Sequence, residues 1–254
     1  IDPNDVISTG FEELDEALVG WKRGEELAVF MARTNQGKSW FGLKFALAAA
    51  LKGERVGIYS GEMSKRQLQE RIICCGKQSY TTSKEESLTQ KELRRRANVT
   101  DIEEFIIRDK LTMIIIDQLS LMEDNNTAKN LPLRQQYGNI SNDLLTLSSR
   151  YSLPSILLVQ SNRQGSLEQR GPTIENIAES DAVGQNATRV ISMRNENGLV
   201  TLNVVKNRYG PVGFTQKYEV DFSINKYKPI KEAQIENTIA RKAKARQMFG
   251  GSAF

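Results

Sequence analysis

The sequence predicts an α/β protein: a mainly parallel β-sheet flanked by helices, with antiparallel strands added at one edge. Short apolar runs alternate with helical segments between residues 25 and 160, which is the order of a parallel sheet. Residues 111–116 (L-T-M-I-I-I) form a nearly continuous apolar run, as expected for a central strand that is buried on both faces. After residue 189 the apolar runs are joined by short turns, which indicates antiparallel hairpins.

The composition is that of an ordinary globular protein, with 254 residues, of which 39% are hydrophobic and 26% charged. No apolar run approaches the ~20 residues of a membrane span, and no signal-peptide pattern is visible. The two cysteines described below fit a reducing cytosol. The sequence has no histidine, which excludes histidine triads and histidine metal sites. Cys74 and Cys75 are adjacent, which argues against a disulfide framework or a zinc site. The net charge of +4 is mild evidence for a polyanionic partner.

The predicted elements follow from hydrophobic periodicity and from turn residues. In chain order, strands are predicted over residues 25–31, 55–61, 111–116, 154–160, 189–193, 199–205 and 214–220. Helices are predicted over residues 7–20, 38–51, 64–75, 89–97, 100–110 and 131–151. The polar segments 76–86, 123–129 and 161–179 are predicted to be loops.

Local signals indicate where several of these elements begin and end. Thr9 is a candidate cap for the first helix. Ser64, with Gln67 three residues later, has the pattern of a capping box. Residues 195–198 (N-E-N-G) and 209–213 (Y-G-P-V-G) supply the turns between the last three strands.

The chain shows no internal repeat and no convincing linker before about residue 225. Residues 1–225 are therefore predicted to form one domain. Residues 226–254 are predicted to form a basic C-terminal tail or helix, for which a solvated surface is favoured over a dedicated nucleic-acid contact.

Residues 32–39 (A-R-T-N-Q-G-K-S) lie between a predicted strand and a predicted helix, which is the context of a phosphate-binding P-loop. The loop N–H groups and the helix N-terminus would hold phosphate oxygens, Lys38 would neutralise the β- and γ-phosphates, and Ser39 would ligate Mg²⁺. The motif G-x-x-x-x-G-K-[ST] has glycine where this sequence has Ala32, and alanine fits there if its φ is negative. The alternative is a chance G-K-S at a helix start. The predicted nucleotide-binding residues are Ala32, Arg33, Thr34, Asn35, Gln36, Gly37, Lys38 and Ser39.

Three polar residues follow neighbouring predicted strands: Glu62, Asp117 and Gln160. Ligands of open α/β sheets bind outside the carboxyl ends of the strands, so we expect these side chains at the P-loop. Asp117 ends the most apolar strand and is the candidate Walker B acid, which would hold Mg²⁺ directly or through water. Glu62 is the candidate base for the attacking water, and Gln160 is a candidate γ-phosphate sensor. Taken singly, Glu62 and Gln160 are equally well explained as solvated loop residues. The P-loop and Asp117 together predict nucleotide hydrolysis.

Five motifs resemble those of the RecA-type ATPases. Within these ATPases, the motifs and their order resemble the C-terminal motor domain of the DnaB-type replicative hexameric helicases, which a phage could also encode. They are A-R-T-N-Q-G-K-S (32–39), G-E-M-S (61–64), I-I-I-D-Q-L-S-L-M (114–122), V-Q-S-N-R (159–163) and K-N-R-Y-G-P-V-G (206–213). The resemblance covers about residues 5–225. In this family the P-loop often has the sequence A-R-x-x-x-G-K-[ST]. Ala32 and Arg33 therefore favour this family over a generic NTPase.

The resemblance implies an ATP- and Mg²⁺-dependent 5′-to-3′ DNA helicase motor that unwinds duplex DNA at replication forks as a homo-hexameric ring. It implies the roles given above for Lys38, Ser39, Glu62, Asp117 and Gln160. It also implies that Lys206 and Arg208 reach the γ-phosphate in the neighbouring subunit. These two residues are two apart in a predicted strand, so both would point to one face. Without the resemblance, an exposed charge pair on an edge strand would be favoured.

The resemblance further implies that single-stranded DNA is held by two loops at the centre of the ring, at residues 123–129 and 163–184. The family's arginine and glycine positions in the second loop hold Ala178 and Asp181 here, and this departure weakens the expected contacts. The candidate DNA-binding residues are Lys129, Arg163, Arg170, Glu179 and Gly184.

The partners implied by the resemblance are single-stranded DNA, a primase and a helicase loader, in the cytoplasm of a bacterium or of a phage-infected cell. Two alternatives share the P-loop core. One is a RecA-like recombinase or strand-exchange ATPase, to which the G-E-M and K-x-R-x-G-P segments are less well matched. The other is a non-unwinding ATP-dependent assembly or loader module.

Overall fold

The computed structural model describes residues 2, 5–76, 88–91, 96–125, 131–161 and 181–231. The helices within these residues are α1 (Glu12–Leu18), α2 (Lys38–Leu51), α3 (Lys65–Gly76), α4 (Val99–Asp109), α5 (Leu133–Tyr151) and α6 (Asp181–Asn186), with 3-10 turns η3 (Leu119–Leu121) and η6 (Phe222–Ile224). The strands are β1 (Val6–Ile7), β2 (Trp21–Lys22), β3 (Leu27–Ala32), β4 (Val56–Ser60), β5 (Leu88–Lys91), β6 (Met113–Asp117), β7 (Ser155–Gln160), β8 (Arg189–Glu196), β9 (Leu199–Asn207), β10 (Thr215–Asp221) and β11 (Lys226–Ile230).

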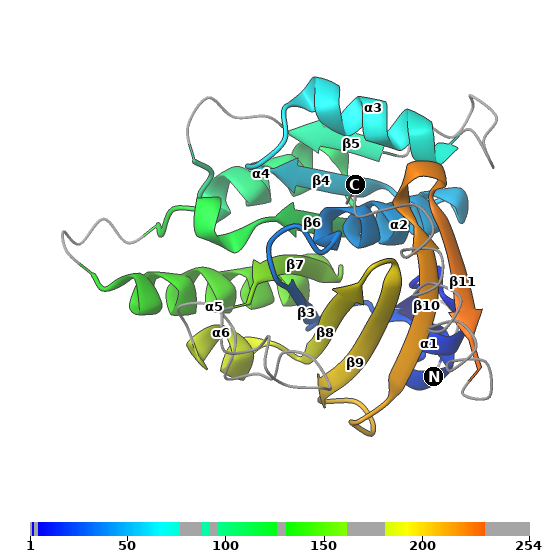
Figure 1. Ribbon diagram of the computed structural model, residues 1–254. Coiled ribbons are helices and arrows are strands. Elements are labelled where there is room, and N and C mark those ends of the chain that lie inside the picture. Colours follow the sequence, from blue (N-terminus) through cyan, green and yellow to red (C-terminus); the bar gives the residue numbers. More distant parts are fainter. Residues whose placement is uncertain are drawn as a thin grey trace.

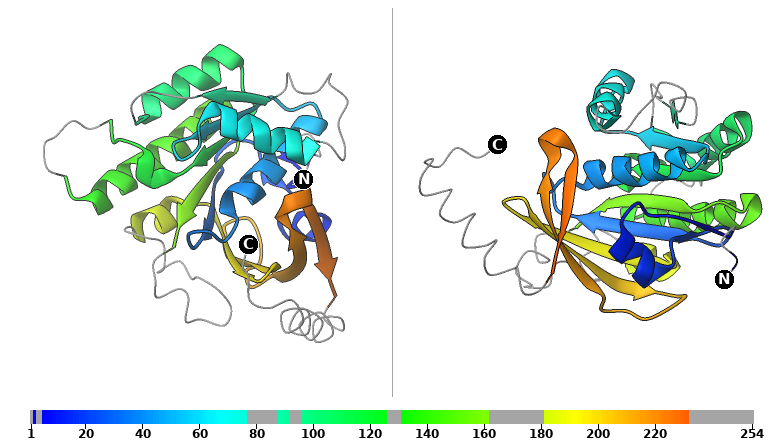
Figure 2. Two further views of the ribbon diagram at one scale, coloured as in Figure 1. Left: turned by 45° about the horizontal axis from the view of Figure 1, so that its top comes forward. Right: turned by 90° about the vertical axis from the view of Figure 1, so that its right-hand side faces the viewer.

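A nine-stranded sheet passes through the middle of the described part of the chain, in the order β11-β10-β9-β8-β3-β7-β6-β4-β5 (Figure 1). The strands from β8 to β5 in this order are parallel. The strands β9, β10 and β11 continue the sheet in antiparallel fashion, and this edge twists away from the parallel strands (Figure 2). The predicted α/β fold, mainly parallel with antiparallel strands at one edge, is therefore confirmed.

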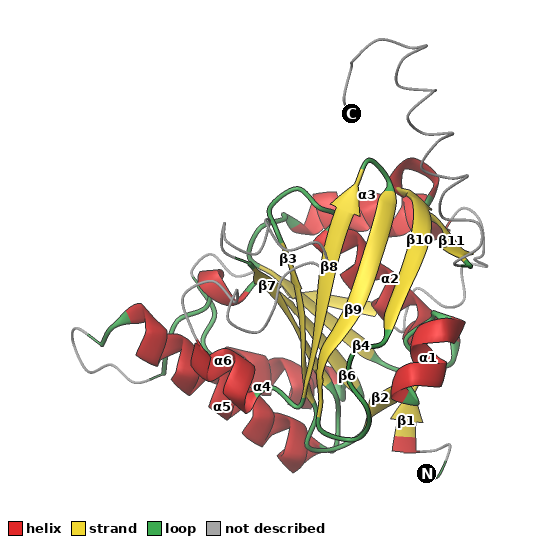
Figure 3. Ribbon diagram, turned by 60° about the horizontal axis from the view of Figure 1, so that its bottom comes forward, coloured by secondary structure: helices red, strands yellow, loops and turns green. Residues whose placement is uncertain are grey.

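Helices cover both faces of the parallel strands (Figure 3). Successive side chains of a strand point to opposite faces, so each central strand contributes to two cores. Phe30 and Ile115 pack in the core under α1, α2 and α3. Their neighbours Val29 and Ile114 pack in the core under α4, α5 and α6. Burial on both faces is why these strands appear in the sequence as continuous apolar runs.

An aromatic cluster joins the N-terminal helix α1 to the antiparallel strands of the sheet. Phe11, next to α1, stacks on Phe41 of α2 with ring centroids 5.4 Å apart. Tyr218 of β10 meets the Phe11 ring edge-on at 5.1 Å, and Phe30 of β3 stacks on Phe41 at 5.5 Å. All four side chains are at most 4% exposed. The cluster thus holds the antiparallel edge against the helix that follows the P-loop.

Most predicted elements are present, with ends shifted by a few residues. The Ser64–Gln67 capping box is confirmed, because Ser64 N donates to Gln67 Oε1 (3.0 Å) and Gln67 N donates to Ser64 Oγ (3.3 Å). The N-G turn between β8 and β9 is also confirmed, with φ of 55° at Asn197 and 79° at Gly198.

Two local predictions are wrong. The helix predicted over residues 89–97 is replaced by strand β5, which pairs in parallel with β4, and by a bridge from Ala97 to Met122. Pairing at the sheet edge overrides the helical propensity of this segment. Thr9 does not cap α1, because the N-cap is Phe11 and the Thr9 hydroxyl accepts the Phe11 N–H in the preceding turn (3.2 Å).

Several short elements were not predicted: β1, β2, α6 and β11. They are too short for periodicity to reveal. Strand β11 pairs with β10, so the boundary expected at residue 225 falls inside the sheet. The rest of the predicted tail, residues 232–254, and the central parts of the predicted loops, residues 77–86, 126–129 and 162–179, lie outside the described residues. Among the described helices, none is long and apolar enough to cross a membrane.

A buried ion pair fixes the amino-terminal edge of the central strands. Arg189 Nη1 lies 3.0 Å from Glu26 Oε1, and both side chains are at most 3% exposed. Arg189 also donates to the carbonyl oxygens of Gly20 (2.5 Å) and Leu18 (2.9 Å), while Lys22 N donates to the Glu26 carboxylate. Burial raises the pKa of Glu26 to about 7, against the opposing effects of Arg189 and of the Lys22 N–H.

This raised pKa makes the stability of the protein depend on pH. Between pH 4.5 and 7 the folded state binds more protons at Glu26 than the unfolded state does, so the stability contributed by Glu26 falls as the pH rises. Glu26→Gln removes this titration. We expect the free energy of unfolding of the wild type to fall relative to that of Glu26→Gln by up to about 3 kcal/mol across this range, as measured by urea denaturation. A difference that stays constant with pH would contradict the raised pKa.

Candidate nucleotide-binding site

The P-loop candidate joins β3 to α2 at the carboxyl edge of the parallel strands. Ala32 is the last residue of β3, is fully buried and pairs with Gln160 of β7. Its φ is not positive, since the positive values in the loop fall on Asn35 (60°) and Gly37 (96°). The loop therefore makes its turn without a glycine at position 32, and alanine fits there as expected.

Gly37 is the position in the loop where the structure requires glycine. Its φ of 96° is unfavourable for any other residue, and a Cβ there would lie 2.3 Å from the ring of Phe222. Gly37 is also the N-cap of α2, and no side chain caps this 14-residue helix. The first N–H groups of the helix and the positive end of its dipole are therefore available to an anion at the loop.

The ends of two neighbouring strands hold the loop in shape. Asn195 of β8 donates from its backbone N to Gln36 Oε1 (2.5 Å) and from its side chain to the Gln36 carbonyl oxygen (3.2 Å). Gln160 of β7 donates to the hydroxyl of Thr34 (2.6 Å). The loop is therefore preformed, and Gln160 connects it to the residues that follow β7.

Lys38 extends from the first turn of α2 to the end of β6. Its Nζ donates to Gln118 Oε1 (2.6 Å) and lies 3.5 Å from Asp117 Oδ1. All three side chains are buried, and the peptide bond between Asp117 and Gln118 is cis. The buried Asp117 carboxylate is thus held beside the P-loop by the lysine of the P-loop itself.

The Asp117 carboxylate has coordination capacity to spare. Neither of its oxygens accepts a hydrogen bond from the described residues. Buried acceptors normally find a donor or an ion. In the described part of the chain no group of three or more His, Cys, Asp or Glu could form a metal cage. One carboxylate and the nearby Ser39 hydroxyl, completed by phosphate oxygens and water, fit the way Mg²⁺ is bound with nucleotides.

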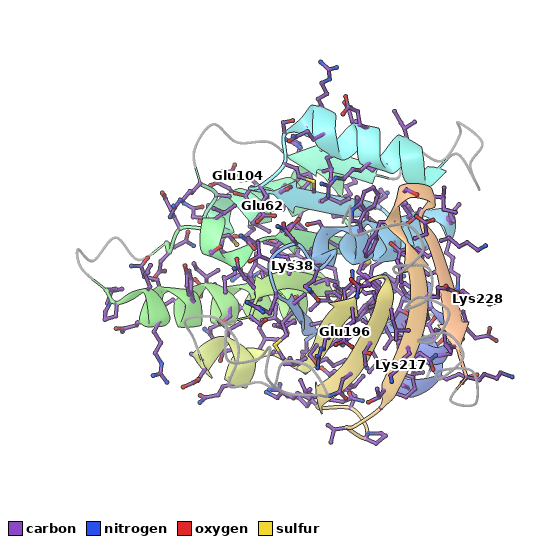
Figure 4. The ribbon with its side chains drawn as sticks, in the orientation of Figure 1. Lys38, Glu62, Glu104, Glu196, Lys217 and Lys228 are labelled. Atoms are coloured by element: carbon purple, nitrogen blue, oxygen red, sulfur yellow. The ribbon has the colours of Figure 1, made fainter. Side chains whose placement is uncertain are left out.

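A cleft with a volume of about 420 Å³ lies over the P-loop. Its lining includes Lys38, Ser39 and most of the loop, together with Glu62 and Gln160. Glu62 follows β4 and is exposed, and its label lies near that of Lys38 in Figure 4. The structure therefore brings the predicted phosphate-binding, base and sensor residues to one cleft, with Asp117 buried next to Lys38.

A larger hollow of about 1050 Å³ adjoins this cleft and shares Asn35, Asn195 and Phe222 with it. It contains neither Lys38 nor Glu62. The smaller cleft is therefore the one with the residues for phosphate chemistry.

Six residues of the cleft are not among the predicted site residues: Met63, Gln118 and Asn195, and a packed group of Trp40, Arg71 and Phe222. The Arg71 guanidinium carbon lies 5.0 Å from the centroid of the Trp40 ring, and Phe222 stacks on the same ring at 6.1 Å. They come from α2, α3 and η6, which are far apart in the sequence. No local pattern distinguishes such residues from surface residues.

Lys206 and Arg208 lie at the opposite end of the strands from the P-loop. Because β9 is antiparallel to β8, its last residue, Asn207, pairs with Arg189 at the start of β8, whereas the P-loop contacts Asn195 near the end of β8. The strand between Arg189 and Asn195 spans about 20 Å at ~3.3 Å per residue. The pair therefore cannot reach the P-loop cleft of the same chain.

The local conformation of this pair differs from the prediction. Strand β9 ends at Asn207, so Arg208 lies in the following turn instead of on the strand, and its N–H donates to the Thr188 carbonyl oxygen (2.8 Å). Lys206 Nζ donates to the carbonyl oxygens of Gly184 and Gln185 at the end of α6, both at 2.8 Å. Burial, and then the nearby Arg208 charge, lower the pKa of Lys206.

The predicted DNA-binding residues are not brought together by the described residues. Lys129, Arg163, Arg170 and Glu179 lie outside them. Gly184 is buried in α6, with its carbonyl oxygen bonded to Lys206, so it offers no exposed surface to DNA. The exposed Asp181, at the start of the same helix, pairs with Arg134 of α5 (2.5 Å).

The sequence matches known proteins along most of its length. The family model of the DnaB-like helicase C-terminal domain matches residues 6–106 and 77–228. The replicative DNA helicase DnaB of Geobacillus stearothermophilus is 30% identical over 272 residues, which cover 90% of this chain and 58% of that protein. The replicative DNA helicase DnaC of Bacillus subtilis (strain 168) is 28% identical over 244 residues, which cover 82% of this chain and 53% of that protein. The chain thus spans little more than half the length of these relatives.

Two solved structures have the same fold. One is a DnaB-like replicative helicase studied for its interactions with primase, with a TM-score of 0.77 at 20% identity over 89% of this chain and 62% of that chain. The other is a separate ATPase domain, with a TM-score of 0.76 at 20% identity over 91% of this chain and 93% of that one. The predicted RecA-like ATPase fold is confirmed by these matches. Because the family model extends from residue 6 to residue 228, and a relative at 30% identity covers 90% of the chain, the chain belongs to the DnaB-like helicase C-terminal domain family.

Proposed function

We propose that this chain is the ATP-hydrolysing motor of a replicative DNA helicase that unwinds duplex DNA at replication forks. It would translocate 5′-to-3′ on single-stranded DNA as a homo-hexameric ring. The observation that supports this most is that Lys38 and Arg208 lie at opposite ends of the strands of one sheet. The P-loop contacts Asn195 near the end of β8, whereas Asn207, next to Arg208, pairs with Arg189 at the start of β8, about 20 Å away along that strand. Family membership supports the substrate, and the polarity and ring size rest on resemblance.

In the proposed site, the loop N–H groups and Lys38 bind the phosphates of ATP. Asp117 and Ser39 would hold Mg²⁺, since the oxygens of the buried carboxylate accept no hydrogen bond within the described residues. The bound ion would neutralise charge on the β- and γ-phosphates. Lys38 then exchanges its contact with Gln118 for a phosphate oxygen, since the two compete for the same ammonium group.

Glu62 is the proposed base. It lines the cleft from the segment after β4, where its carboxylate can orient or deprotonate the attacking water. Gln160 is the proposed sensor, because it bonds Thr34 of the loop and ends the strand that leads into residues 162–180. Loss of the γ-phosphate would change this contact and pass the change along the chain.

Arg208 and Lys206 are proposed to complete the site of the neighbouring subunit as an arginine finger and a lysine. Arg208 is exposed, which suits this role. Lys206 must first leave the two carbonyl oxygens of α6 to reach a phosphate. Lys129, Arg163 and Arg170 remain the proposed contacts to DNA phosphates, and a primase and a helicase loader the proposed partners, in a bacterial or phage-infected cytoplasm.

Strand displacement from a forked duplex tests the proposed function. We expect the chain to displace the strand in the presence of ATP and Mg²⁺ when the fork carries a 5′ single-stranded arm, and not when only the 3′ arm is present. ATP hydrolysis without displacement of either fork would contradict the helicase proposal and favour a non-unwinding ATPase. Exchange between homologous strands would favour a recombinase.

Two substitutions in the cleft separate binding from chemistry. Lys38→Ala should abolish hydrolysis and weaken nucleotide binding, because it removes the charge that faces the phosphates. Glu62→Gln should retain binding and lower the hydrolysis rate by about 10²–10⁴-fold, the contribution of a positioned general base. Binding is measured with a fluorescent ATP analogue and hydrolysis by phosphate release. Equal loss of binding and hydrolysis in Glu62→Gln would indicate a structural role instead.

A mixing experiment tests whether Arg208 acts in trans. Arg208→Ala should lower hydrolysis by about 10³–10⁵-fold, the contribution of an arginine finger. Mixed with Glu62→Gln subunits, it should regain activity, since some interfaces then combine an intact Glu62 with an intact Arg208. Absence of recovery in rings verified to be mixed would contradict the assignment.

A further inference from the structure

The turn that carries Arg208 is held by side chains on both sides of it. Residues 206–209 read K-N-R-Y. Lys206 is bonded to two carbonyl oxygens of α6, and Asn207 and Tyr209 make the contacts described below. Arg208 is exposed, and its guanidinium has no hydrogen bond or ion pair within the described residues. Of these four side chains, only that of Arg208 is thus left available to a ligand from outside.

Asn207 uses both ends of its side-chain amide. Its Oδ1 accepts hydrogen bonds from Arg189 Nε (3.2 Å) and from Tyr209 N (3.2 Å), and its Nδ2 donates to the Pro211 carbonyl oxygen (3.2 Å). A short amide bonded to the backbone two residues further on forms an Asx-turn. This turn encloses Arg208, so Asn207 determines the backbone conformation from which the Arg208 side chain extends.

Tyr209 fixes the other side of Arg208. Its hydroxyl donates to the carbonyl oxygen of Glu25 (2.8 Å). Its ring centroid lies 4.4 Å from Lys22 Nζ and 5.1 Å from Arg189 Cζ, which are cation–π distances. Tyr209 therefore attaches the turn to residues that precede β3.

Asn207 and Tyr209 both contact Arg189, which is itself immobilised. Arg189 is paired with the buried Glu26 at 3.0 Å and bonded to two carbonyl oxygens near α1. Moving it would leave a buried charge without its partner, which is costly. The turn is therefore anchored to a rigid point of the sheet, not to a surface loop.

We propose that Asn207 and Tyr209 are positioning residues, anchored on the buried Arg189–Glu26 pair, that hold Arg208 in the geometry in which it meets the nucleotide of the neighbouring subunit. The inference rests on the proposed function, in which Arg208 acts in trans. Arginine has a long and flexible side chain, so a fixed backbone raises the fraction of time that the guanidinium spends in the productive position.

Asn207→Ala and Tyr209→Ala test this role by steady-state kinetics of the full chain. We expect kcat to fall by about 10- to 100-fold, as for a displaced catalytic group, with an unchanged Kd for a fluorescent ATP analogue at the variant's own P-loop. Asn207→Asp keeps the Oδ1 acceptor for Arg189 and should retain most of the wild-type kcat. Asn203→Ala is the matched control, because Asn203 lies on the same strand and, within the described residues, its side chain accepts a hydrogen bond only from Thr215 of β10. Unchanged kcat in both alanine variants would overturn the proposal.

Mixing separates positioning in trans from damage to the fold. Asn207→Ala subunits keep their own cleft, so mixed rings with Glu62→Gln subunits should regain activity, as Arg208→Ala subunits would. No recovery in verified mixed rings would overturn the proposal. If Lys38→Ala and Arg208→Ala abolish hydrolysis while Asn207→Ala and Tyr209→Ala leave kcat unchanged, this inference fails and the proposed function stands. If Lys38→Ala leaves hydrolysis intact, the proposed function itself fails.

Trypsin cleavage after Arg208 gives a readout that does not require rings. If Asn207 holds the turn, cleavage at this bond, followed by mass spectrometry, should be about 10-fold faster in Asn207→Ala than in Asn203→Ala, because only the first variant frees the local backbone. Cleavage at other sites serves as the internal control. Equal rates at Arg208 in the two variants would overturn the proposal.

Discussion

The register of three central strands, β3, β7 and β6, is the constraint on which the rest of the structure depends. It sets Ala32 beside Gln160, and Asp117 beside Leu158, at one edge of the sheet. These strands are buried on both faces, so a slip of one residue would move every side chain to the opposite core. Packing that satisfies both cores therefore also places the P-loop, the buried acid and the candidate sensor together.

The change from parallel to antiparallel pairing at β9 has the second large consequence. It carries the chain from the carboxyl ends of the parallel strands, where Asn195 holds the P-loop, back to their amino ends, where Arg208 is exposed. The Glu26–Arg189 pair holds the amino ends of these strands together. The P-loop candidate thus lies at one end of the strands and the exposed Arg208 at the other. Copies of the chain joined head to tail would bring the Arg208 end of one copy to the P-loop end of the next. Such contacts form a closed ring when the rotation that relates one copy to the next allows it.

The sequence predicts well what depends on local pattern. The apolar runs identify the central strands, and the P-loop and Asp117 follow because the carboxyl ends of parallel strands share an edge. Residues that depend on tertiary contacts escape prediction. Phe222 meets Gly37 only because the β10–β11 hairpin reaches α2, and β5 is a strand only because β4 offers it an edge. Arg208 leaves the predicted strand because the Asn207 side chain starts a turn, a competition between side chain and ladder that periodicity cannot detect.

The central claim is that the hydrolytic site is shared between subunits, and ATP turnover per chain measured over a dilution series tests it most directly. Mass in solution is measured at each concentration with ATP, Mg²⁺ and single-stranded DNA present. Turnover per chain is expected to fall in parallel with the fraction of chains in oligomers and to be lost in the monomer. Turnover that stays constant down to concentrations at which the chain is monomeric would contradict a site completed by a neighbour.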